Sequence, residues 1–312
     1  MTETLKKRSA PPKLETESRA FVVRMVDYRD SDRIVTLFTE ETGKVSAFAR
    51  GARKSRKRFG AALSPYMLGH VRLCGSPNSG KMFTLSEINP VERFSSIGKD
   101  VVKLALAGYF AELCRETIPD SNPEPAIFDL LLKAYRILDT TRPTKAFVRA
   151  FELHLLAGLG MSPRLERCGG PTPEIHCEAV LDPVYIHGIE PEVAETTGHG
   201  NPSSEKIFAF DLTLGGALCP SCSKGARTGK ISGTSLFYMK KMLNSDLDET
   251  TQAEMEIPVS VNVEIRQALG PALIELAGKP LKTMTFIDKL RRWETPGQRR
   301  STEEDTGECR ND

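Results

Sequence analysis

The stretch AFVVRMVDYRDSDRIVTLFTEETGKVSAFARGARKSRKR, residues 20–58, decides the fold. Short runs rich in Val, Phe, Thr and Ile alternate in it with Asp, Ser and Gly, a pattern typical of β-strands joined by turns. With the sequence that follows, it predicts strands at residues 20–28, 33–39, 44–49, 68–74 and 81–88. Five strands without an intervening helix indicate a small closed barrel or sandwich. An OB-fold has this strand count and size, but composition does not distinguish it from an SH3-like barrel.

After residue 90 the apolar residues recur at the 3.6-residue period of amphipathic helices. Helices are predicted at residues 97–117, 125–139, 144–159, 235–243, 261–277 and 281–293. The sequence therefore predicts an α+β protein with a β-barrel at residues 18–92 and a mainly α-helical domain at residues 93–297. The polar residues 1–17 and 298–312 are predicted to be a flexible N-terminus and a disordered tail.

The positive charge of the chain is concentrated in the predicted barrel. Residues 1–95 hold 18 Lys and Arg against 10 Asp and Glu, whereas residues 96–312 hold 25 against 31. Six of the nine residues in RGARKSRKR, at 50–58, are basic: Arg50, Arg53, Lys54, Arg56, Lys57 and Arg58. Such clusters supply sequence-independent affinity for nucleic acid through phosphate contacts and counterion release. A solvated charge run and a targeting sequence are the alternative interpretations.

Aromatic residues near the basic run are candidates for stacking on unpaired bases. They are Phe48, Phe59, Tyr66 and Phe83. The simpler interpretation is that most of them fill the barrel core, and for Phe48 and Phe83 we favour this interpretation.

Four of the seven cysteines lie in the middle of the chain, with spacing that suggests a metal site. Cys219 and Cys222 form a C-x-x-C knuckle whose thiolates can bind one Zn²⁺. Cys168 and Cys177 would complete a set of four sulfur ligands, and His176 is an alternative to Cys177. The predicted ligands of a structural zinc are Cys168, Cys177, Cys219 and Cys222, within residues 165–225. A site that has lost its metal and a redox C-x-x-C are the alternatives.

No catalytic motif is found in the sequence, because P-loop, G-x-G-x-x-G, H-E-x-x-H and G-x-S-x-G patterns do not occur. The protein is therefore predicted to bind its partners and not to be an enzyme. No apolar run approaches the roughly 18 residues that a membrane helix needs, and the N-terminus has no signal-peptide core. These features predict a cytoplasmic protein, in which Cys74 and Cys114 are core residues. General nucleic-acid (RNA) binding and zinc-dependent hydrolysis are the alternative functions.

Four segments together resemble the RecO family of bacterial recombination mediators. Residues 20–66 have the family's order of an apolar strand, a D/E-S-D-x-I-V-T-L-F-T strand, a T-x-x-x-G-K turn and an A-R-G-A-R-K loop. FELHLLAGLGMSPRLERC, residues 151–168, is similar to the helix that leads into the family's first cysteine. LGGALCPSC at residues 214–222 and GKPLKTMTFIDKL at residues 278–290 are similar to its second cysteine pair and its closing segment.

The resemblance implies an N-terminal OB-fold, a helical domain that in many members holds a four-cysteine zinc site, and a role that is not enzymatic. Members bind single- and double-stranded DNA, anneal complementary strands and, with RecR, help RecA to replace single-strand binding protein. They also bind the C-terminal tail of single-strand binding protein. Basic residues of the last predicted helix are candidate contacts for that tail, and a solvated helix face is the alternative interpretation: Lys282, Lys289, Arg291 and Arg292.

Residue by residue, the family's DNA-binding role carries over onto the basic residues of the run at 50–58. The zinc role carries over directly onto Cys168, Cys219 and Cys222, whereas Cys177 matches by order alone. A member of this family is expected to be cytoplasmic and associated with the nucleoid.

Overall fold

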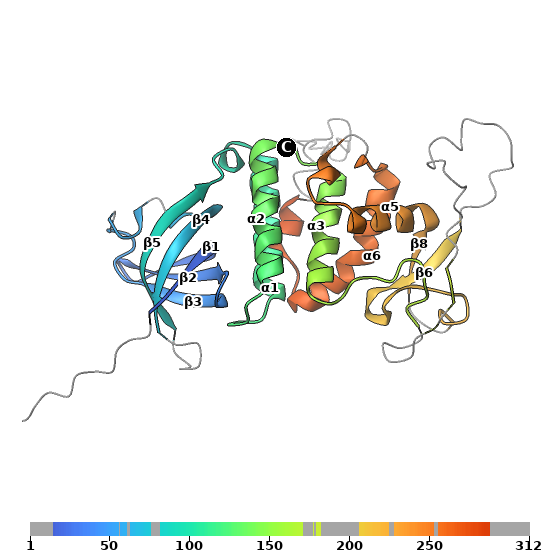
Figure 1. Ribbon diagram of the computed structural model, residues 1–312, viewed down its shortest axis with the longest axis horizontal. Helices are drawn as coiled ribbons and strands as arrows, with labels where there is room; N and C mark the ends of the chain where they lie inside the picture. Colours follow the sequence, from blue (N-terminus) through green and yellow to red (C-terminus); the bar gives the residue numbers. More distant parts are fainter. Residues whose placement is uncertain are drawn as a thin grey trace, which may run out of the picture.

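The computed structural model describes residues 15–55, 57–60, 63–75, 82–170, 177, 179–181, 206–224, 228–252 and 255–287. The described elements lie in a row along the longest axis: a β-barrel, a group of helices, and a small sheet at the far end (Figure 1). Strands come first in the chain and most helices follow, as predicted for an α+β protein. None of the described helices combines the length and the apolar character needed to cross a membrane.

Five strands form a closed barrel in the order β1-β2-β3-β5-β4. They are β1 (Glu15–Tyr28), β2 (Asp32–Thr39), β3 (Gly43–Ala49), β4 (Met67–Cys74) and β5 (Phe83–Arg93). β1 pairs with both β2 and β4, and β3 runs parallel to β5, which closes the sheet on itself. All five predicted strands are present, and their number, order and closure are consistent with an OB-fold.

Two of the strands are longer than predicted. β1 begins at Glu15 because its first residues pair with the end of β4, where Glu15 lies opposite Cys74. β5 continues through Pro90, which lies opposite Gly69 at an irregularity in the register. Proline lacks an N–H, so it is tolerated where the ladder is interrupted. Partner strands, not local propensity, define both extensions.

The barrel has its own apolar interior. The alternation of buried and more exposed residues along β3 illustrates how the strands contribute to it. Val45, Ala47 and Ala49 are buried in the interior, whereas Ser46 is exposed and Phe48 is half-buried on the outer face. The prediction that Phe48 belongs to the core is therefore wrong. The same prediction for Phe83 is confirmed, because Phe83 is buried in the interior cluster.

Helices make up most of the chain beyond the barrel. They are α1 (Val101–Thr117), α2 (Pro125–Thr140), α3 (Lys145–Gly158), α5 (Gly233–Asn244) and α6 (Val259–Ala277), with 3-10 turns η3 (Ile97–Lys99), η4 (Leu212–Leu214) and η5 (Glu249–Thr251). Asp100 caps α1 by accepting from the backbone N–H groups of Val102 and Lys103. Residues 282–287 are also helical, and the rest of the helix predicted up to residue 293 lies outside the described residues.

A small sheet was not predicted by the helical pattern. Its strands are β6 (Ile207–Asp211), β7 (Gly216–Leu218) and β8 (Gly229–Ser232), in the order β7-β6-β8. Each has between three and five residues. Runs this short show no reliable alternation of apolar and polar residues, so tertiary pairing is needed to reveal them.

The barrel docks onto α2 through aromatic residues on its outer face. The ring of Phe128 lies 5.1 Å from that of Phe21 on β1 and 5.5 Å from that of Phe38 on β2. These three residues belong to one buried cluster that continues through the helices. Gly43 makes the closest backbone approach, because a Cβ at this position would lie 2.0 Å from the carbonyl oxygen of Asn122.

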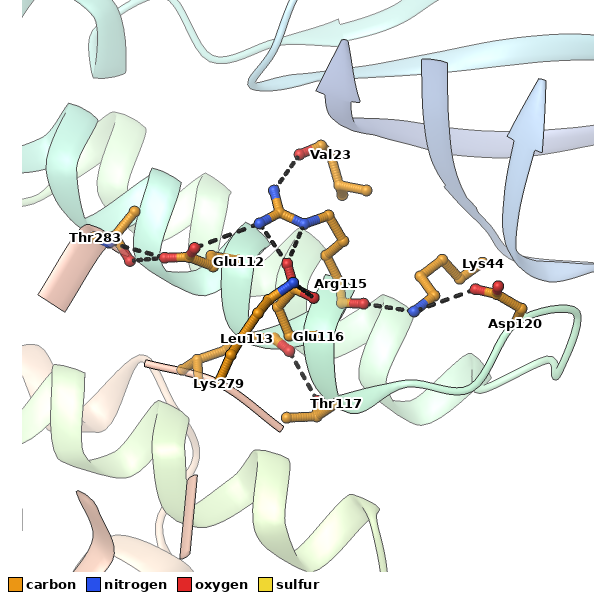
Figure 2. A network of polar contacts seen from close by, with 10 residues as sticks. All are labelled: Val23, Lys44, Glu112, Leu113, Arg115, Glu116, Thr117, Asp120, Lys279 and Thr283. Carbon is orange, nitrogen blue, oxygen red and sulfur yellow. Dashed lines mark hydrogen bonds and ion pairs between the residues drawn. The ribbon is translucent and has the colours of Figure 1, made fainter. Parts of the chain in front are cut away.

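Arg115 of α1 is the centre of a polar network at the same junction (Figure 2). Its guanidinium donates to the carbonyl of Val23 on β1 at 3.3 Å and pairs with Glu112 and Glu116 at 3.4 and 2.6 Å. The ammonium of Lys44 on β3 donates to the main-chain carbonyl of Arg115 at 2.6 Å. The barrel is therefore joined to α1 by charged as well as apolar contacts.

The C-terminal segment enters this network from the other side of α1 (Figure 2). The backbone N–H and the hydroxyl of Thr283 donate to Glu112 at 2.8 and 2.6 Å. Lys279 pairs with Glu116 at 2.7 Å. The two carboxylates of α1 thus hold the C-terminal segment, while Arg115 connects them to the barrel.

Candidate functional site

The basic run at residues 50–58, called the basic loop below, lies at the end of β3 and is tied to the β1–β2 turn. The backbone N–H of Arg53 donates to the carbonyl of Ser31 at 3.0 Å. The backbone N–H of Gly51 donates to Asp32 Oδ1 at 2.7 Å. This hydrogen bond is the main reason why the pKa of the Asp32 carboxyl lies below its ordinary value. The loop is therefore anchored by its backbone, and the guanidinium of Arg58 adds a hydrogen bond to the carbonyl of Arg50 at 2.8 Å.

The charges of the basic loop are exposed and largely uncompensated. The side chains of Arg50, Arg53, Lys54, Lys57 and Arg58 are exposed, and Arg56 lies outside the described residues. Arg53 lies 3.8 Å from Asp27, which already binds Arg33 at 2.8 Å. Among the described residues, the other basic side chains of the loop form no ion pair. Uncompensated cations on an anchored loop create a positive surface to which anions are attracted.

The four predicted metal ligands meet in the helical part of the chain. The Sγ atoms of Cys168, Cys177, Cys219 and Cys222 all lie within 4.8 Å of one another. Cys168 and Cys219 are buried, and the other two are half-buried. Tetrahedral coordination at a Zn–S distance of about 2.3 Å requires sulfur atoms about 3.8 Å apart, so this grouping fits a zinc ion after small movements. His176 lies outside the described residues.

Backbone pairing brings the two halves of this cysteine cluster together. The segment around Cys168 pairs with β7, because the N–H of Gly169 donates to the carbonyl of Ala217 at 2.8 Å. The N–H of Cys168 donates to the carbonyl of Ala179 at 2.9 Å, which places Cys177 nearby. Gly216 permits the close approach, since a Cβ there would lie 2.6 Å from the carbonyl oxygen of Arg164. The wide spacing of the four cysteines in the sequence is thus compatible with a compact site.

Burial, followed by contacts with the other thiols, raises the pKa of Cys222 to about 12, and burial also raises the pKa of Cys168, so Cys219 is the one of these three thiols that ionises most readily. The backbone N–H of Cys222 is the main cause that lowers the pKa of the Cys219 thiol to about 7. A thiolate is the form in which cysteine binds a metal. Cys114 is a contrast, because complete burial raises its pKa to about 12 and it is a core residue, as predicted. Cys74 is half-buried, so its assignment to the core is wrong.

Two features define the kind of protein: a β-barrel with an exposed basic loop, and a helical region that carries a four-cysteine cluster. Family models match the barrel and the first part of the helical region, which includes Cys168 and Cys177. The model described as "Recombination protein O N terminal" matches residues 14–94, and the model described as "Recombination protein O C terminal" matches residues 98–180.

Curated relatives match most of the chain. The DNA repair protein RecO of Anaeromyxobacter dehalogenans (strain 2CP-C) is 35% identical over 270 residues, which cover 86% of this chain and 94% of that protein. The DNA repair protein RecO of Symbiobacterium thermophilum is 32% identical over 273 residues, with coverage of 86% and 95%. The DNA repair protein RecO of Myxococcus xanthus is 31% identical over 273 residues, with coverage of 87% and 96%. The chain belongs to the RecO family, and this membership supports a role in DNA repair and recombination.

Proposed function

We propose that the protein is a recombination mediator that binds single- and double-stranded DNA through the basic loop of its barrel. The observation that carries the proposal is the anchored loop, whose exposed cations have few counter-ions within the described residues. We assign the barrel, predicted at residues 18–92 and built of strands that run from Glu15 to Arg93, as an OB-fold, and we assign the following residues up to 297 to the helical domain. The proposed DNA contacts are Arg50, Arg53, Lys54, Arg56, Lys57 and Arg58.

The physics of strand annealing suits such a surface. Two complementary strands repel each other through their phosphates, and a cationic surface lowers this repulsion without reading the sequence. In the proposed mechanism the protein anneals complementary strands and, with RecR, helps RecA to load onto DNA coated with single-strand binding protein. The proposal requires neither nucleotide hydrolysis nor any other catalysis, and it places the protein in the cytoplasm at the nucleoid.

The cysteine cluster is proposed to hold a structural Zn²⁺. Cys168, Cys177, Cys219 and Cys222 would be its four ligands, and a bound zinc would cross-link the segments that carry them. Four sulfur ligands leave no open position for substrate, which argues against the alternative of a zinc-dependent hydrolase.

Lys282 is exposed in the C-terminal segment and remains a proposed contact for the tail of single-strand binding protein. The other three candidates for this contact, Lys289, Arg291 and Arg292, lie outside the described residues.

A salt titration tests the proposed DNA site. Binding to a labelled single-stranded oligonucleotide would be measured for the wild type and for a variant with five loop residues changed to alanine: Arg53, Lys54, Arg56, Lys57 and Arg58. For single strands, the logarithm of the binding constant falls with the logarithm of the salt concentration with a slope of about −0.7 per phosphate neutralised. The loss of three to five contacts should therefore flatten this slope by roughly 2 to 3.5 units. A matched control changes Arg72 and Arg136, which form ion pairs elsewhere on the surface.

An unchanged slope in the folded loop variant would contradict the proposal and leave the loop as a solvated charge run. The same titration with structured RNA tests the alternative function. Tighter binding to RNA than to single-stranded DNA at equal salt would favour a general RNA-binding protein.

A further inference from the structure

A pair of aromatic residues, the exposed Tyr28 and the half-buried Phe48, lies on the outer face of the barrel beside the basic loop. Tyr28 is the last residue of β1, and its side chain is 38% exposed. Its ring lies 5.5 Å from that of Phe48 on β3, with the two planes at 79°. Neither ring belongs to the two buried clusters that the structure describes. The pair is therefore not needed to fill the barrel or its junction with the helices.

Two arginines flank this pair. The guanidinium carbon of Arg29 lies 5.1 Å from the centre of the Tyr28 ring, and that of Arg50 lies 5.7 Å from the centre of the Phe48 ring. Both arginines are exposed. Arg29 has a φ of 54°, which is uncommon for a residue other than glycine. The backbone at the end of β1 thus turns so that a cation covers the exposed ring.

The aromatic pair and the basic loop are physically continuous. Asp32 lies opposite Tyr28 in the β1–β2 pairing and accepts the hydrogen bond from Gly51. Arg50 begins the basic loop and also lies over Phe48. An anionic strand that follows the loop would therefore pass the ring of Tyr28.

We propose that the exposed ring of Tyr28, supported by Phe48 and flanked by Arg29 and Arg50, stacks against an unpaired base of single-stranded DNA. The inference rests on the proposed function and adds a contact to bases that the basic loop alone does not provide. Every base has a π-face, so stacking stabilises the complex without selecting a sequence. The guanidinium of Arg29, which lies over the Tyr28 ring, would move aside to admit the base and would then attract a neighbouring phosphate.

The geometry also distinguishes single strands from duplexes. Inside a duplex both faces of a base are covered by its neighbours, so a protein ring can stack only on a base that is unpaired or terminal. The basic loop, in contrast, attracts the phosphates of either form. Tyr28 would therefore favour single strands, while the loop would provide the affinity that both forms share.

Two labelled oligonucleotides of equal length test the inference, one with bases and one built of abasic units. Tyr28→Ala should weaken binding to the first by about 5- to 150-fold, the range that loss of one stacked base produces. It should leave binding to the abasic strand unchanged, because the phosphates are the same. Tyr28→Phe keeps the ring and should bind both strands as the wild type does. Phe286→Ala removes an exposed ring from the C-terminal segment and is the control on another surface.

Equal binding of Tyr28→Ala and wild type to the strand with bases would overturn the inference. So would an equal loss on both strands, since the effect would then not concern bases. Phe48→Leu removes the supporting ring and should give a smaller loss on the strand with bases alone. The salt slope of the loop variant is an independent result: an unchanged slope there counts against the proposed DNA site, whatever the effect at Tyr28.

Discussion

The basic loop and the cysteine cluster have opposite surroundings. The described basic side chains of the loop are exposed on the barrel surface, and the loop is anchored mainly through its backbone. The cluster includes two buried cysteines, and Cys168 and Cys219 belong to the large apolar core of the helical part. Substitutions in the loop should therefore change binding with little effect on folding. Substitutions in the cluster should change folding with little direct effect on the barrel surface.

The largest effect is expected when the cysteine cluster is broken. In Cys219→Ser/Cys222→Ser two of the four proposed ligands are lost, so bound zinc should disappear. The free energy of unfolding should fall by about 4 kcal/mol or more, as is typical when a structural metal is lost. Metal content by elemental analysis and unfolding in urea would measure both effects. Cys74→Ser, which changes a cysteine outside the cluster, should retain the metal and most of the stability.

Retention of one zinc per chain by the double variant would show that these cysteines are not its ligands. Wild-type protein purified without zinc would favour a site that has lost its metal. A fall in the stability of the double variant, together with the wild-type salt dependence of DNA binding, would sharpen the comparison, because it would separate the core of the helical part from the proposed DNA surface.

The aromatic junction between barrel and helices should be the next most sensitive feature. Phe128→Ala deletes a fully buried ring that contacts Phe21 and Phe38, and this should lower the free energy of unfolding by about 3–5 kcal/mol. Urea unfolding followed by circular dichroism measures the loss. Phe286→Ala, at a ring that is 46% exposed, should stay within about 0.5 kcal/mol of the wild type. Similar losses in the two variants would mean that the junction is not a tightly packed interface.

A smaller effect is expected at the polar network of the same junction. Arg115→Met keeps much of the side-chain length but leaves Glu112 and Glu116 without this partner, which should destabilise the fold by about 1–3 kcal/mol. Arg136→Met is the matched control, because its ion pair with Glu92 is exposed and should contribute under about 1 kcal/mol. Equal effects from the two substitutions would contradict a special role for the network.

The pH dependence of the free energy of unfolding gives a second measurement of the contribution of this network. Burial raises the pKa of Glu116, but hydrogen bonds from Lys279 and Arg115 outweigh it and leave the pKa below the ordinary value of 4.5. A carboxyl whose pKa is lowered by folding contributes stability above its unfolded pKa, and this is lost as pH falls through the folded value. The stability difference between wild type and Arg115→Met should therefore shrink below about pH 4.5. A constant difference across this range would exclude ionised Glu116 as the source.

Local patterns in the sequence were sufficient to predict several features of the structure. The five strands, the main helices and the C-x-x-C knuckle all follow from residue order, because turn residues, hydrophobic period and short spacings act over a few residues. The exposure of the basic loop also follows, since a run of six cations in nine residues is hard to bury.

Other features could not be predicted from local sequence, because they depend on contacts between residues that are far apart in the chain. The strands β6, β7 and β8 are too short to show a period, and they become visible only once they pair. For Phe48 the sequence leaves base stacking and the barrel core as alternatives, and its place on the outer face depends on the register of β3 against β2. Tyr28 was overlooked as a stacking candidate because it is 20 residues or more from the basic loop in the sequence and becomes its neighbour through the β1–β2 hairpin.

By itself, then, the sequence determined the kind of most elements, the sign of the charge on the barrel and the identity of the four cysteines in the cluster. The tertiary structure alone decided how closely the four sulfur atoms approach one another, which aromatic rings face solvent and which face of the barrel the helices cover. The physical reason is the distance along the chain over which each effect acts. Propensity and periodicity are set by neighbours in the chain, whereas a site is assembled by packing and by backbone hydrogen bonds between segments far apart, as between Gly169 and Ala217.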